Sequence, residues 1–360
     1  MLISVIIPTF NGKHRLGRCL DAVEAACAKL PPGETEVVVV DDGGTDGTAQ
    51  YVGEHYPTVH VIRLETNRGF AAAVNAGSRA AGGEWLGVLN DDTAVDPAWI
   101  SGARLDERPG GVAAVASLIV DFAAPAVQSA GDGYSAAGLA FQRSSGEGVS
   151  AAGRRGRVFS ACAAAAFYRR SVFLGMGGFD EDFESYYEDV DLGFRLNLMG
   201  LHTIYEPESV CRHLGAASHG PGSWRRLRNS ARNSEIVFFS CMPASLLVRR
   251  LPAHAAAVAM QAVLRVFQGG LLPFLAGKAA FASAIARVLK RRRRIQEKAV
   301  SGAAGIFAMV DYNWLTLHAG AVLRRRREPH TCDSCFSSEV PSAESTPYRY
   351  AHPATSRASK

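Results

Sequence analysis

The sequence predicts an α/β fold, with a mainly parallel central sheet and helices on both of its faces. Short apolar runs such as residues 37–40 and 85–89 have the length and continuity of strands buried in a parallel sheet. Segments with helical spacing of apolar residues alternate with these runs, which implies right-handed crossovers between parallel strands. An acidic pair follows each of the two runs, at the strand ends where such sheets bind ligands.

The first 89 residues predict four strands separated by three helices. A Pro-Pro-Gly sequence at 31–33 stops the first helix. Residues 112–158 contain short apolar pieces interrupted by Gly and Ser, and we expect irregular β structure and loops there. A later helix, 189–199, ends before Gly200. The expected strands are 3–8, 36–40, 59–64 and 85–89, and the expected helices between them are 15–30, 48–55 and 71–81.

Charge divides the chain into two parts. Residues 1–218 carry 17 basic and 27 acidic side chains, a net charge of −10, whereas residues 219–360 carry 22 and 7, a net charge of +15. The acidic part would repel a phosphate-bearing ligand, so a bridging divalent cation is expected there. The basic, apolar part is typical of proteins that meet an anionic surface, either lipid or nucleic acid. We expect an α/β domain at 1–218, a helical membrane-associating segment at 219–328 and a disordered polar tail at 329–360.

The N-terminus and the cysteines indicate the compartment. The first residues, MLISVIIPTFNG, have no basic stretch before the apolar core and no small-residue cleavage site. They predict a strand and turn rather than a signal peptide, so we expect a cytoplasmic protein. Seven cysteines, an odd number, indicate no disulfide framework and agree with a reducing compartment. Cys332 and Cys335 form a CxxC without a second pair nearby, which favours unpaired thiols over a zinc site.

Two apolar stretches in the basic part end in arginine-rich clusters, at 290–294 and 324–327. Arg265 and Lys278 interrupt the first stretch, so it has no charge-free run as long as a plain membrane span usually requires. Apolar helices bordered by arginines fit the surface of a membrane that contains anionic lipids. We therefore expect a peripheral protein on the inner face of the cell membrane. A soluble helical cap with solvated basic ends is the alternative.

Six motifs occur in order along the acidic part: SVIIPTFNG, VVVVDDGGTDGT, TNRGFAAAVNAG, LNDDT, GGFDEDFESYYEDVDLGFR and RHLGAAS. Together they resemble a family 2 glycosyltransferase over about residues 3–218, and the variants NRGFAAAVN and FDEDF…YYEDVDL are closest to the bacterial rhamnosyltransferase-like branch. The resemblance implies a GT-A fold and an inverting, metal-dependent hexosyl- or rhamnosyltransferase. It would move a sugar from a dTDP- or UDP-sugar, dTDP-rhamnose among them, to a lipid-linked or glycan acceptor in cell-surface polysaccharide synthesis.

The first acidic pair predicts the nucleotide site. Asp42 ends a strand beside a Gly-rich turn, where a carboxylate can accept a hydrogen bond from the ring N–H of uracil or thymine. The resemblance also implies the base contact there. Asp41 either touches the ligand or only forms the turn. The resemblance implies further donor-binding residues, which are Pro8, Thr9, Asn11, Asn67, Gly69, Asn75, Asn90 and Asp91.

The other acidic clusters predict the metal and the base. Asn90-Asp91-Asp92 occupies the position of the family's Asp-x-Asp motif, with Asn90 in place of the first Asp. The resemblance implies Mg²⁺ or Mn²⁺ held against the diphosphate, chiefly by Asp92 and completed by His213. It also implies that Asp189 is the base that takes the proton of the acceptor hydroxyl. Supporting or acceptor-side residues are Asp180, Glu188, Asp191 and Arg195.

A different class of protein stays open at this point: a nucleic-acid-binding or scaffold protein that carries a degenerate transferase-like domain. The arginine runs lie next to apolar segments rather than among aromatic residues, which favours lipid over RNA. We therefore expect no nucleic-acid partner. The oligomeric state has no signature in the sequence.

Overall fold

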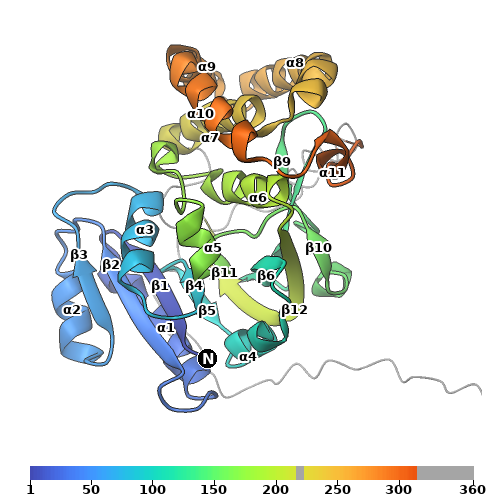
Figure 1. Cartoon of the computed structure of the whole chain (residues 1–360). Helices are drawn as coiled ribbons and strands as arrows, with labels where there is room; N and C mark the ends of the chain where they lie inside the picture. Colours follow the sequence, from blue (N-terminus) through green and yellow to red (C-terminus); the bar gives the residue numbers. More distant parts are fainter. Residues whose placement is uncertain (216–222, 314–360) are drawn as a thin grey trace, which may run out of the picture.

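The computed structural model describes residues 1–215 and 223–313, and its central feature is a sheet of ten strands (Figure 1). In chain order these strands are β1 (Ile3–Thr9), β2 (Thr35–Asp41), β3 (His60–Arg63), β4 (Trp85–Leu89), β5 (Thr93–Val95), β6 (Val112–Asp121), β7 (Val127–Ala130), β10 (Gly156–Val158), β11 (Ala165–Arg169) and β12 (His202–His213). Their order across the sheet is β10-β12-β6-β11-β4-β1-β2-β3, with β5 paired to β12 and β7 to β6.

The sheet is mainly parallel. β1 runs parallel to both β2 and β4, and β2 runs parallel to β3. β11 lies antiparallel between β4 and β6, so those two strands point the same way, and β12 is parallel to β6. The carboxyl ends of β1, β2, β4 and β12 therefore meet at one edge of the sheet.

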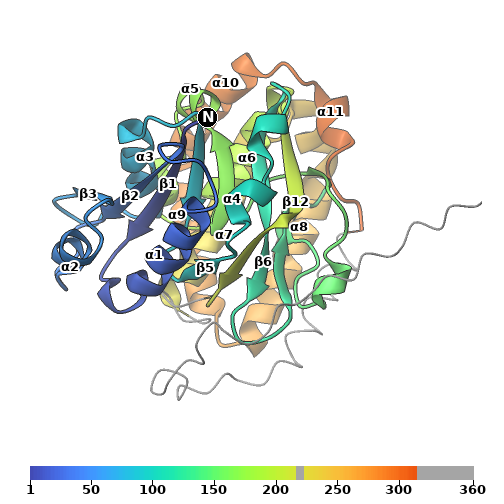
Figure 2. The ribbon, with the colours of Figure 1, turned by 90° about the horizontal axis from the view of Figure 1, so that it is seen from below.

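Helices cover both faces of the sheet, as the alternating pattern predicts. One hydrophobic cluster joins one face to α1, α2 and α4, and another joins the opposite face to α3, α5 and α6. Figure 2 shows the sheet from below, with α1 and α4 in front of the strands. The predicted α/β fold is confirmed. The bounds of these helices are α1 (Lys13–Cys27), α2 (Thr48–His55), α3 (Phe70–Ala80), α4 (Trp99–Gly102), α5 (Arg170–Gly175) and α6 (Glu188–Leu198).

The stretch 112–158 is more regular than its sequence indicates. It begins with β6, a ten-residue strand that is buried at all positions except its last. The expectation of irregular structure is wrong for this part. Alanine and serine in VAAVASLIVD give a weak strand signal, but β11 and β12 pair with β6 on its two sides and enforce the extended backbone. The rest includes a separate two-stranded sheet of β8 (Asp132–Tyr134) and β9 (Ala140–Gln142).

The basic part of the chain is helical, as predicted, and packs on α6. A third hydrophobic cluster joins Phe159 and Phe194 of the α/β part to Ile236, Phe238 and Val288 of these helices. In Figure 1 they form a layer beyond α6, away from the large sheet. The helices are α7 (Trp224–Cys241), α8 (Ala244–Phe267), α9 (Leu271–Ser283), α10 (Ile285–Lys298) and α11 (Ala303–Phe307).

Within residues 1–215 and 223–313, no single helix is long and apolar enough to cross a membrane. Among these residues, α9 and α10 taken together have the length and composition of a membrane span, but they are bent by 66° at their junction. The second arginine cluster, the CxxC and the tail predicted at 329–360 lie outside the described residues. The division of the chain at 218 and 328 stays a prediction.

Candidate functional site

Strand ends bring predicted site residues from distant parts of the chain to one edge of the sheet. His213 lies opposite Thr93 in the β5–β12 pairing, which explains how a residue 123 positions after Asn90 reaches the second acidic cluster. The residues at this edge are Thr9, Asp41, Asn90 and His213, at the ends of β1, β2, β4 and β12.

Asp42 is buried and joined to the loop that precedes α3. Its two carboxylate oxygens accept the backbone N–H groups of Arg68 and Gly69, each at 2.8 Å. Burial raises the pKa of Asp42, and these two hydrogen bonds oppose that rise. Gly69 has a φ of 90°, which a residue with a side chain rarely adopts. Asp41 accepts the N–H of Gly44 at 2.8 Å and so closes its own turn. The contact of Asp42 with a nucleotide base stays a prediction.

Asp91 is part of an internal polar network. It accepts a hydrogen bond of 2.6 Å from the Thr9 hydroxyl and two from the Arg15 guanidinium, at 3.0 and 2.9 Å. Burial raises the pKa of Asp91, against the opposing effect of Arg15 and Thr9. Two of the predicted donor-binding residues, Thr9 and Asp91, thus join β1 directly to the end of β4, and Arg15 adds a link from Asp91 to α1.

Asp92 and His213 face each other, with Asp92 Oδ1 3.2 Å from His213 Nε2. Asn90 Nδ2 lies 3.4 Å from the same ring nitrogen. The other ring nitrogen, Nδ1, lies 2.8 Å from Gln128 Oε1, while Gln128 Nε2 donates to Asp121 at 3.0 Å and to the His213 carbonyl at 2.9 Å. Because the amide NH₂ of Gln128 serves two acceptors, its oxygen must face Nδ1. Nδ1 therefore carries a proton, and Nε2, which faces Asp92, either carries a second proton or is the ring nitrogen that can bind a cation.

This pair of acceptors fits a divalent cation. Asp92 Oδ1 is buried and has no hydrogen-bond donor in the described part of the chain. The contact with an imidazole lone pair is repulsive unless a proton or a cation lies between the two atoms. Burial alone would raise the pKa of Asp92, but His213 and the more distant Arg15 hold it below its usual range. Carboxylate oxygens suit Mg²⁺ and Mn²⁺, and the imidazole nitrogen is the softer ligand of the two.

Asp189, the predicted base, is the second residue of α6 and is only half-buried. Its two oxygens accept the N–H groups of Ala163 and Val190, at 3.0 and 2.8 Å. Burial raises the pKa of Asp189, and these hydrogen bonds oppose the rise. The carbonyl of the next residue, Ala164, accepts the N–H of Asn90 at 3.0 Å. Two consecutive residues before β11 therefore connect Asp189 to the edge that carries Asp92.

The other acidic residues of α6 have different surroundings. Glu188 is buried, and burial followed by the charge of Asp189 raises its pKa to about 8. Asp191 contacts two guanidinium groups, with Arg195 Nε at 2.8 Å and Arg291 Nη2 at 2.5 Å. Burial would raise the pKa of Asp191, but the two cations hold it below its usual range. Asp180 accepts a hydrogen bond of 2.7 Å from Arg291 Nε.

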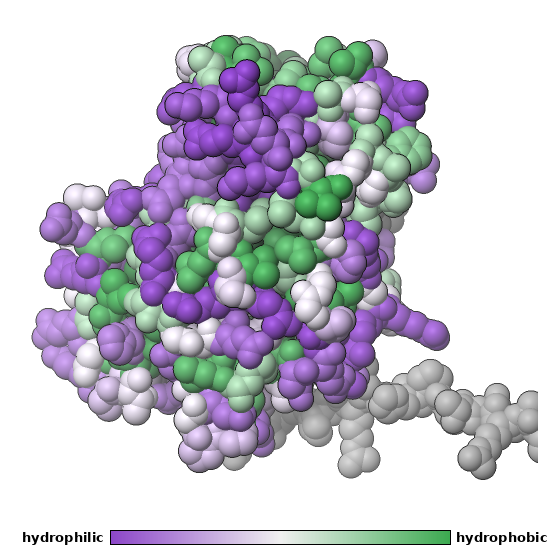
Figure 3. Space-filling view, in the orientation of Figure 1, coloured by the Kyte–Doolittle hydropathy of each residue, from purple (hydrophilic) through white to green (hydrophobic). Residues whose placement is uncertain are grey.

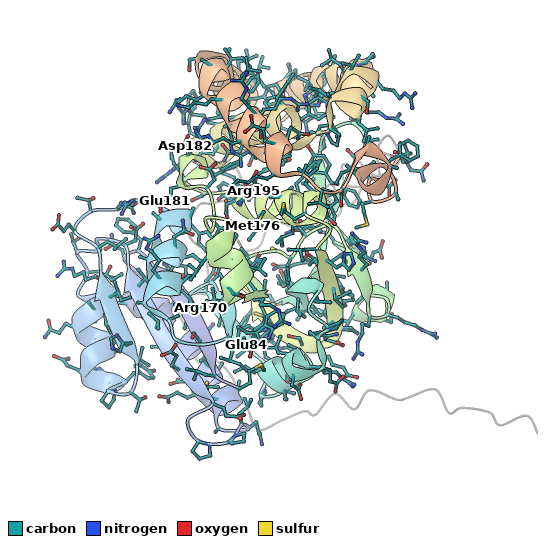
Figure 4. The ribbon with its side chains drawn as sticks, in the orientation of Figure 1. Glu84, Arg170, Met176, Glu181, Asp182 and Arg195 are labelled. Atoms are coloured by element: carbon teal, nitrogen blue, oxygen red, sulfur yellow. The ribbon has the colours of Figure 1, made fainter. Side chains whose placement is uncertain are left out.

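Asn75 and Arg195 lie apart from the strand-end residues. The Asn75 amide donates to the Phe179 carbonyl at 2.7 Å and accepts the Phe179 N–H at 2.9 Å, which holds the loop before α6. Arg195 donates to the carbonyl of Met176 at 2.8 Å (Figure 4). Both side chains line a cavity of about 900 Å³ that also touches Asp180. The structure brings neither of them to the Asp92–His213 pair.

The remaining predicted donor residues surround the first strand end. Asn11 adopts a φ of 50° and accepts the Thr45 N–H at 2.8 Å, so it joins the loop after β1 to the turn after β2. Pro8 is buried in β1, opposite Val40, and Asn67 is exposed. The contact of these three residues with a nucleotide stays a prediction.

Sequence reasoning missed four residues that shape this site: Arg15, Gln128, Asp132 and Arg291. Arg15 and Arg291 look like surface charges of helices, and Gln128 has no motif of its own. Asp132 had a usable signal, because it is the one acidic residue in the small-residue stretch QSAGDGYSAAG. In the structure it is 4% exposed, and one atom of its side chain lies within 4.8 Å of Cys162 and of Asp189.

Comparisons with known proteins show what the chain is similar to. Residues 4–174 match the family model described as "Glycosyl transferase family 2". The chain is 28% identical over 247 residues to N-acetylglucosaminyl-diphospho-decaprenol L-rhamnosyltransferase of Mycobacterium tuberculosis, across 61% of this chain and 78% of that protein.

Two solved structures share the fold. The first is S. aureus TarS 1–349 in complex with UDP-GlcNAc, with a TM-score of 0.52 and 18% identity over 82% of this chain and 88% of that one. The second is GalNAc-T7 with UDP, GalNAc and Mn²⁺, with a TM-score of 0.50 and 18% identity over 66% of this chain and 48% of that one. At these identities the likeness shows the GT-A fold alone.

Proposed function

We propose that this chain, which belongs to glycosyl transferase family 2, is an inverting, divalent-metal-dependent transferase that moves a sugar from a nucleotide-diphosphate donor to a lipid-linked acceptor. One observation carries the proposal. The N–H of Ala163 bonds to Asp189 and the carbonyl of Ala164 bonds to Asn90, so consecutive residues of one short loop connect the predicted base to the turn that carries Asp92. This connection supports the proposal, because sugar transfer from a diphosphate needs a base and a cation site close to each other.

The donor side would be held by Asp92 and His213. Gln128 keeps a proton on Nδ1 of His213, so Nε2 is the ring nitrogen that would bind a cation. Bound there, Mn²⁺ would neutralise charge that develops on the diphosphate leaving group. We favour Mn²⁺ over Mg²⁺ because one of the two protein ligands is a nitrogen. The presence of UDP and Mn²⁺ in the GalNAc-T7 structure supports a divalent cation in the proposed reaction.

Asp189 would act as the general base. The acceptor oxygen attacks the anomeric carbon as the bond from that carbon to the diphosphate oxygen breaks on the opposite face, and the hydroxyl proton passes to Asp189. A single displacement of this kind inverts the anomeric configuration. The hydrogen bonds from Ala163 and Val190 keep the Asp189 carboxylate oriented before it takes the proton.

Asp42 would recognise the base of a UDP- or dTDP-sugar. Its oxygens already accept two backbone N–H groups, but a carboxylate has about four acceptor positions, so one more N–H can be accommodated. The similarity to an L-rhamnosyltransferase supports a dTDP- or UDP-linked hexose or rhamnose as donor. The name of that relative also supports a lipid diphosphate that carries N-acetylglucosamine as the class of acceptor.

A lipid-linked acceptor requires access to a membrane, and we assign that contact to the tip of α8 and α9. Four large apolar side chains there are 48–81% exposed. Figure 3 shows hydrophobic residues gathered over α8 and α9, beside a hydrophilic area over α10. We refer to the four residues as the apolar tip, and they are Val266, Phe267, Leu272 and Leu275.

In the basic cluster at 290–294, two side chains make internal contacts and three are exposed. Arg291 pairs with Asp180 and Asp191, and Arg292 donates to the carbonyls of Phe239 and Met242 at 2.9 and 2.6 Å. Only the other three basic side chains, Lys290, Arg293 and Arg294, are exposed. Each would contribute about 1 kcal/mol near an anionic leaflet, so insertion of the apolar tip has to supply part of the attachment.

A thermal-shift screen of UDP- and dTDP-sugars tests the donor proposal, because a bound ligand raises the melting temperature by mass action. We expect a rise with at least one of these sugars and Mn²⁺, and its loss in EDTA. Asp92→Ala should abolish the rise in both buffers. No rise with any nucleotide sugar in the presence of Mn²⁺ would overturn the proposed function.

A further inference from the structure

Three side chains from separate segments lie close together, and one of them is the predicted base. They belong to Asp132 at the start of β8, Cys162 before β11 and Asp189 on α6, and one ligand atom of each lies within 4.8 Å of the other two. Asp132 also anchors the intervening loop, because its N–H donates to the Ser160 carbonyl at 2.9 Å and its carbonyl accepts the Phe159 N–H at 3.1 Å. The same loop then reaches Asp189 through Ala163.

The two carboxyl groups are stabilised unequally. Asp189 accepts two backbone N–H groups, whereas the Asp132 carboxyl accepts a hydrogen bond from the Ser129 hydroxyl at 3.2 Å. Asp189 is partly exposed to solvent, and Asp132 is 4% exposed. Two carboxylates this close in a buried site cannot both ionise without a large cost. The negative charge belongs on the better stabilised group, which is Asp189.

The groups that surround this pair are neutral at neutral pH. Burial raises the pKa of Cys162 and Tyr168 well above their usual ranges, and it raises the pKa of Tyr187 to about 12. Glu188, next to Asp189 on α6, has its pKa raised to about 8. Burial, followed by the charge of Asp189, raises the pKa of Asp132 well above its usual range. Asp189 therefore carries the charge of this group of side chains.

We propose that Asp132 is a positioning residue that keeps the single proton of the Asp132–Asp189 pair, so that Asp189 meets the acceptor hydroxyl as a carboxylate. This inference rests on the proposed function, since it takes Asp189 as the base. In the transfer step the O–H bond of the acceptor breaks and an O–H bond forms on Asp189, while Asp132 keeps its own proton. A neutral Asp132 also avoids a second negative charge near an anionic donor.

Carbon-13 NMR of protein labelled at the aspartate carboxyl carbons tests the protonation state without donor or acceptor. We expect one signal of a protonated carboxyl at neutral pH that is absent in Asp132→Asn. In Asp189→Asn the same signal should titrate at lower pH, because the neighbouring charge is gone. An Asp132 signal that titrates in the ordinary aspartate range, near pH 4, would overturn the inference.

The pH profile of kcat tests the consequence for the reaction. As the pH rises through the raised pKa of Asp132, the carboxyl of the wild type ionises beside Asp189, and turnover should decline. Asp132→Asn should remove this decline, and Ser129→Ala should move it to higher pH, because the Ser129 hydroxyl stabilises the ionised form of Asp132. Profiles that are scaled down without a change of shape would indicate a merely structural residue and overturn the inference. Full turnover in Asp189→Asn would refute the proposed base while leaving the NMR result on Asp132 intact.

Discussion

Arg291 on α10 forms an ion pair with Asp191 on α6, with Nη2 of the guanidinium 2.5 Å from the carboxylate oxygen Oδ1. The same guanidinium contacts Asp180, in the segment between α5 and α6, at 2.7 Å. Asp191 is completely buried and lies two residues after Asp189. A residue of the basic cluster is thus part of the support of the helix that carries the predicted base.

Arg291→Ala should lower the free energy of unfolding by about 3 kcal/mol or more, because it breaks a buried ion pair and leaves Asp191 with Arg195 as partner. Arg293→Ala is the matched control. It removes the same charge from a side chain that is 83% exposed and lies 4.0 Å from Glu297, and it should cost less than about 0.5 kcal/mol. Urea denaturation measures both values. Equal, small losses would contradict the structural role of Arg291.

Local pattern was enough to predict the early strands, because those runs are continuously apolar and end at turn residues. β6 was missed because its alanines and serine carry little strand signal, and its extended backbone depends on β11 and β12, which follow much later in the chain. The same limit explains the arginine cluster. Arg291 and Lys290 are adjacent in sequence, and only tertiary packing distinguishes the buried one from the exposed one.

In the candidate site, too, local sequence predicted some features and tertiary packing determined the others. Motif order pointed to Asp92 and His213, and strand direction accounts for their meeting. The motif position implied different roles for Asp91 and Asp92 but gave no structural reason for the difference, since both are acidic residues of one turn. Arg15, on α1, makes that difference by occupying Asp91 and leaving Asp92 Oδ1 without a donor in the described residues.

Asp91→Ala and Asp92→Ala should therefore have opposite phenotypes. Asp91→Ala leaves Arg15 without its buried partner and should reduce the free energy of unfolding by about 3 kcal/mol or more. Asp92→Ala should leave stability nearly unchanged and abolish the Mn²⁺-dependent heat of nucleotide-sugar binding in calorimetry. Undiminished donor binding by Asp92→Ala in EDTA would refute the metal assignment.

Glu188 should make stability depend on pH. Its pKa in the folded protein is about 8, above the usual value of 4.5, so its contribution to stability is complete below about pH 4.5 and is lost as the pH rises through 8. The free energy of unfolding should fall over this window with a slope of up to about 1.4 kcal/mol per pH unit from this one proton. Glu188→Gln should make the slope shallower in urea titrations at pH 5 to 8. An unchanged slope would contradict the burial of a neutral Glu188.

The apolar tip should attach the protein to membranes. We expect the full chain to float with phosphatidylglycerol vesicles at low salt and less completely at high salt, because screening weakens the contribution of the basic residues. Replacement of Phe267 and Leu272 by serine should reduce flotation at both salt concentrations. Val248→Ser, at an equally exposed apolar residue near the other end of α8, is the control and should float normally. Wild-type protein that stays at the bottom of the gradient in both buffers would favour a soluble helical cap.

The most direct test of the proposed transferase is the turnover number of Asp189→Asn, measured with a nucleotide sugar, Mn²⁺ and a lipid-linked acceptor. Asparagine keeps the shape of the side chain but cannot take a proton, so kcat should fall by roughly 10²-fold or more. Donor affinity should stay close to that of the wild type, because the cation and the diphosphate are assigned to Asp92 and His213 and not to Asp189. A wild-type kcat in Asp189→Asn would contradict the assignment of Asp189 as the base of sugar transfer.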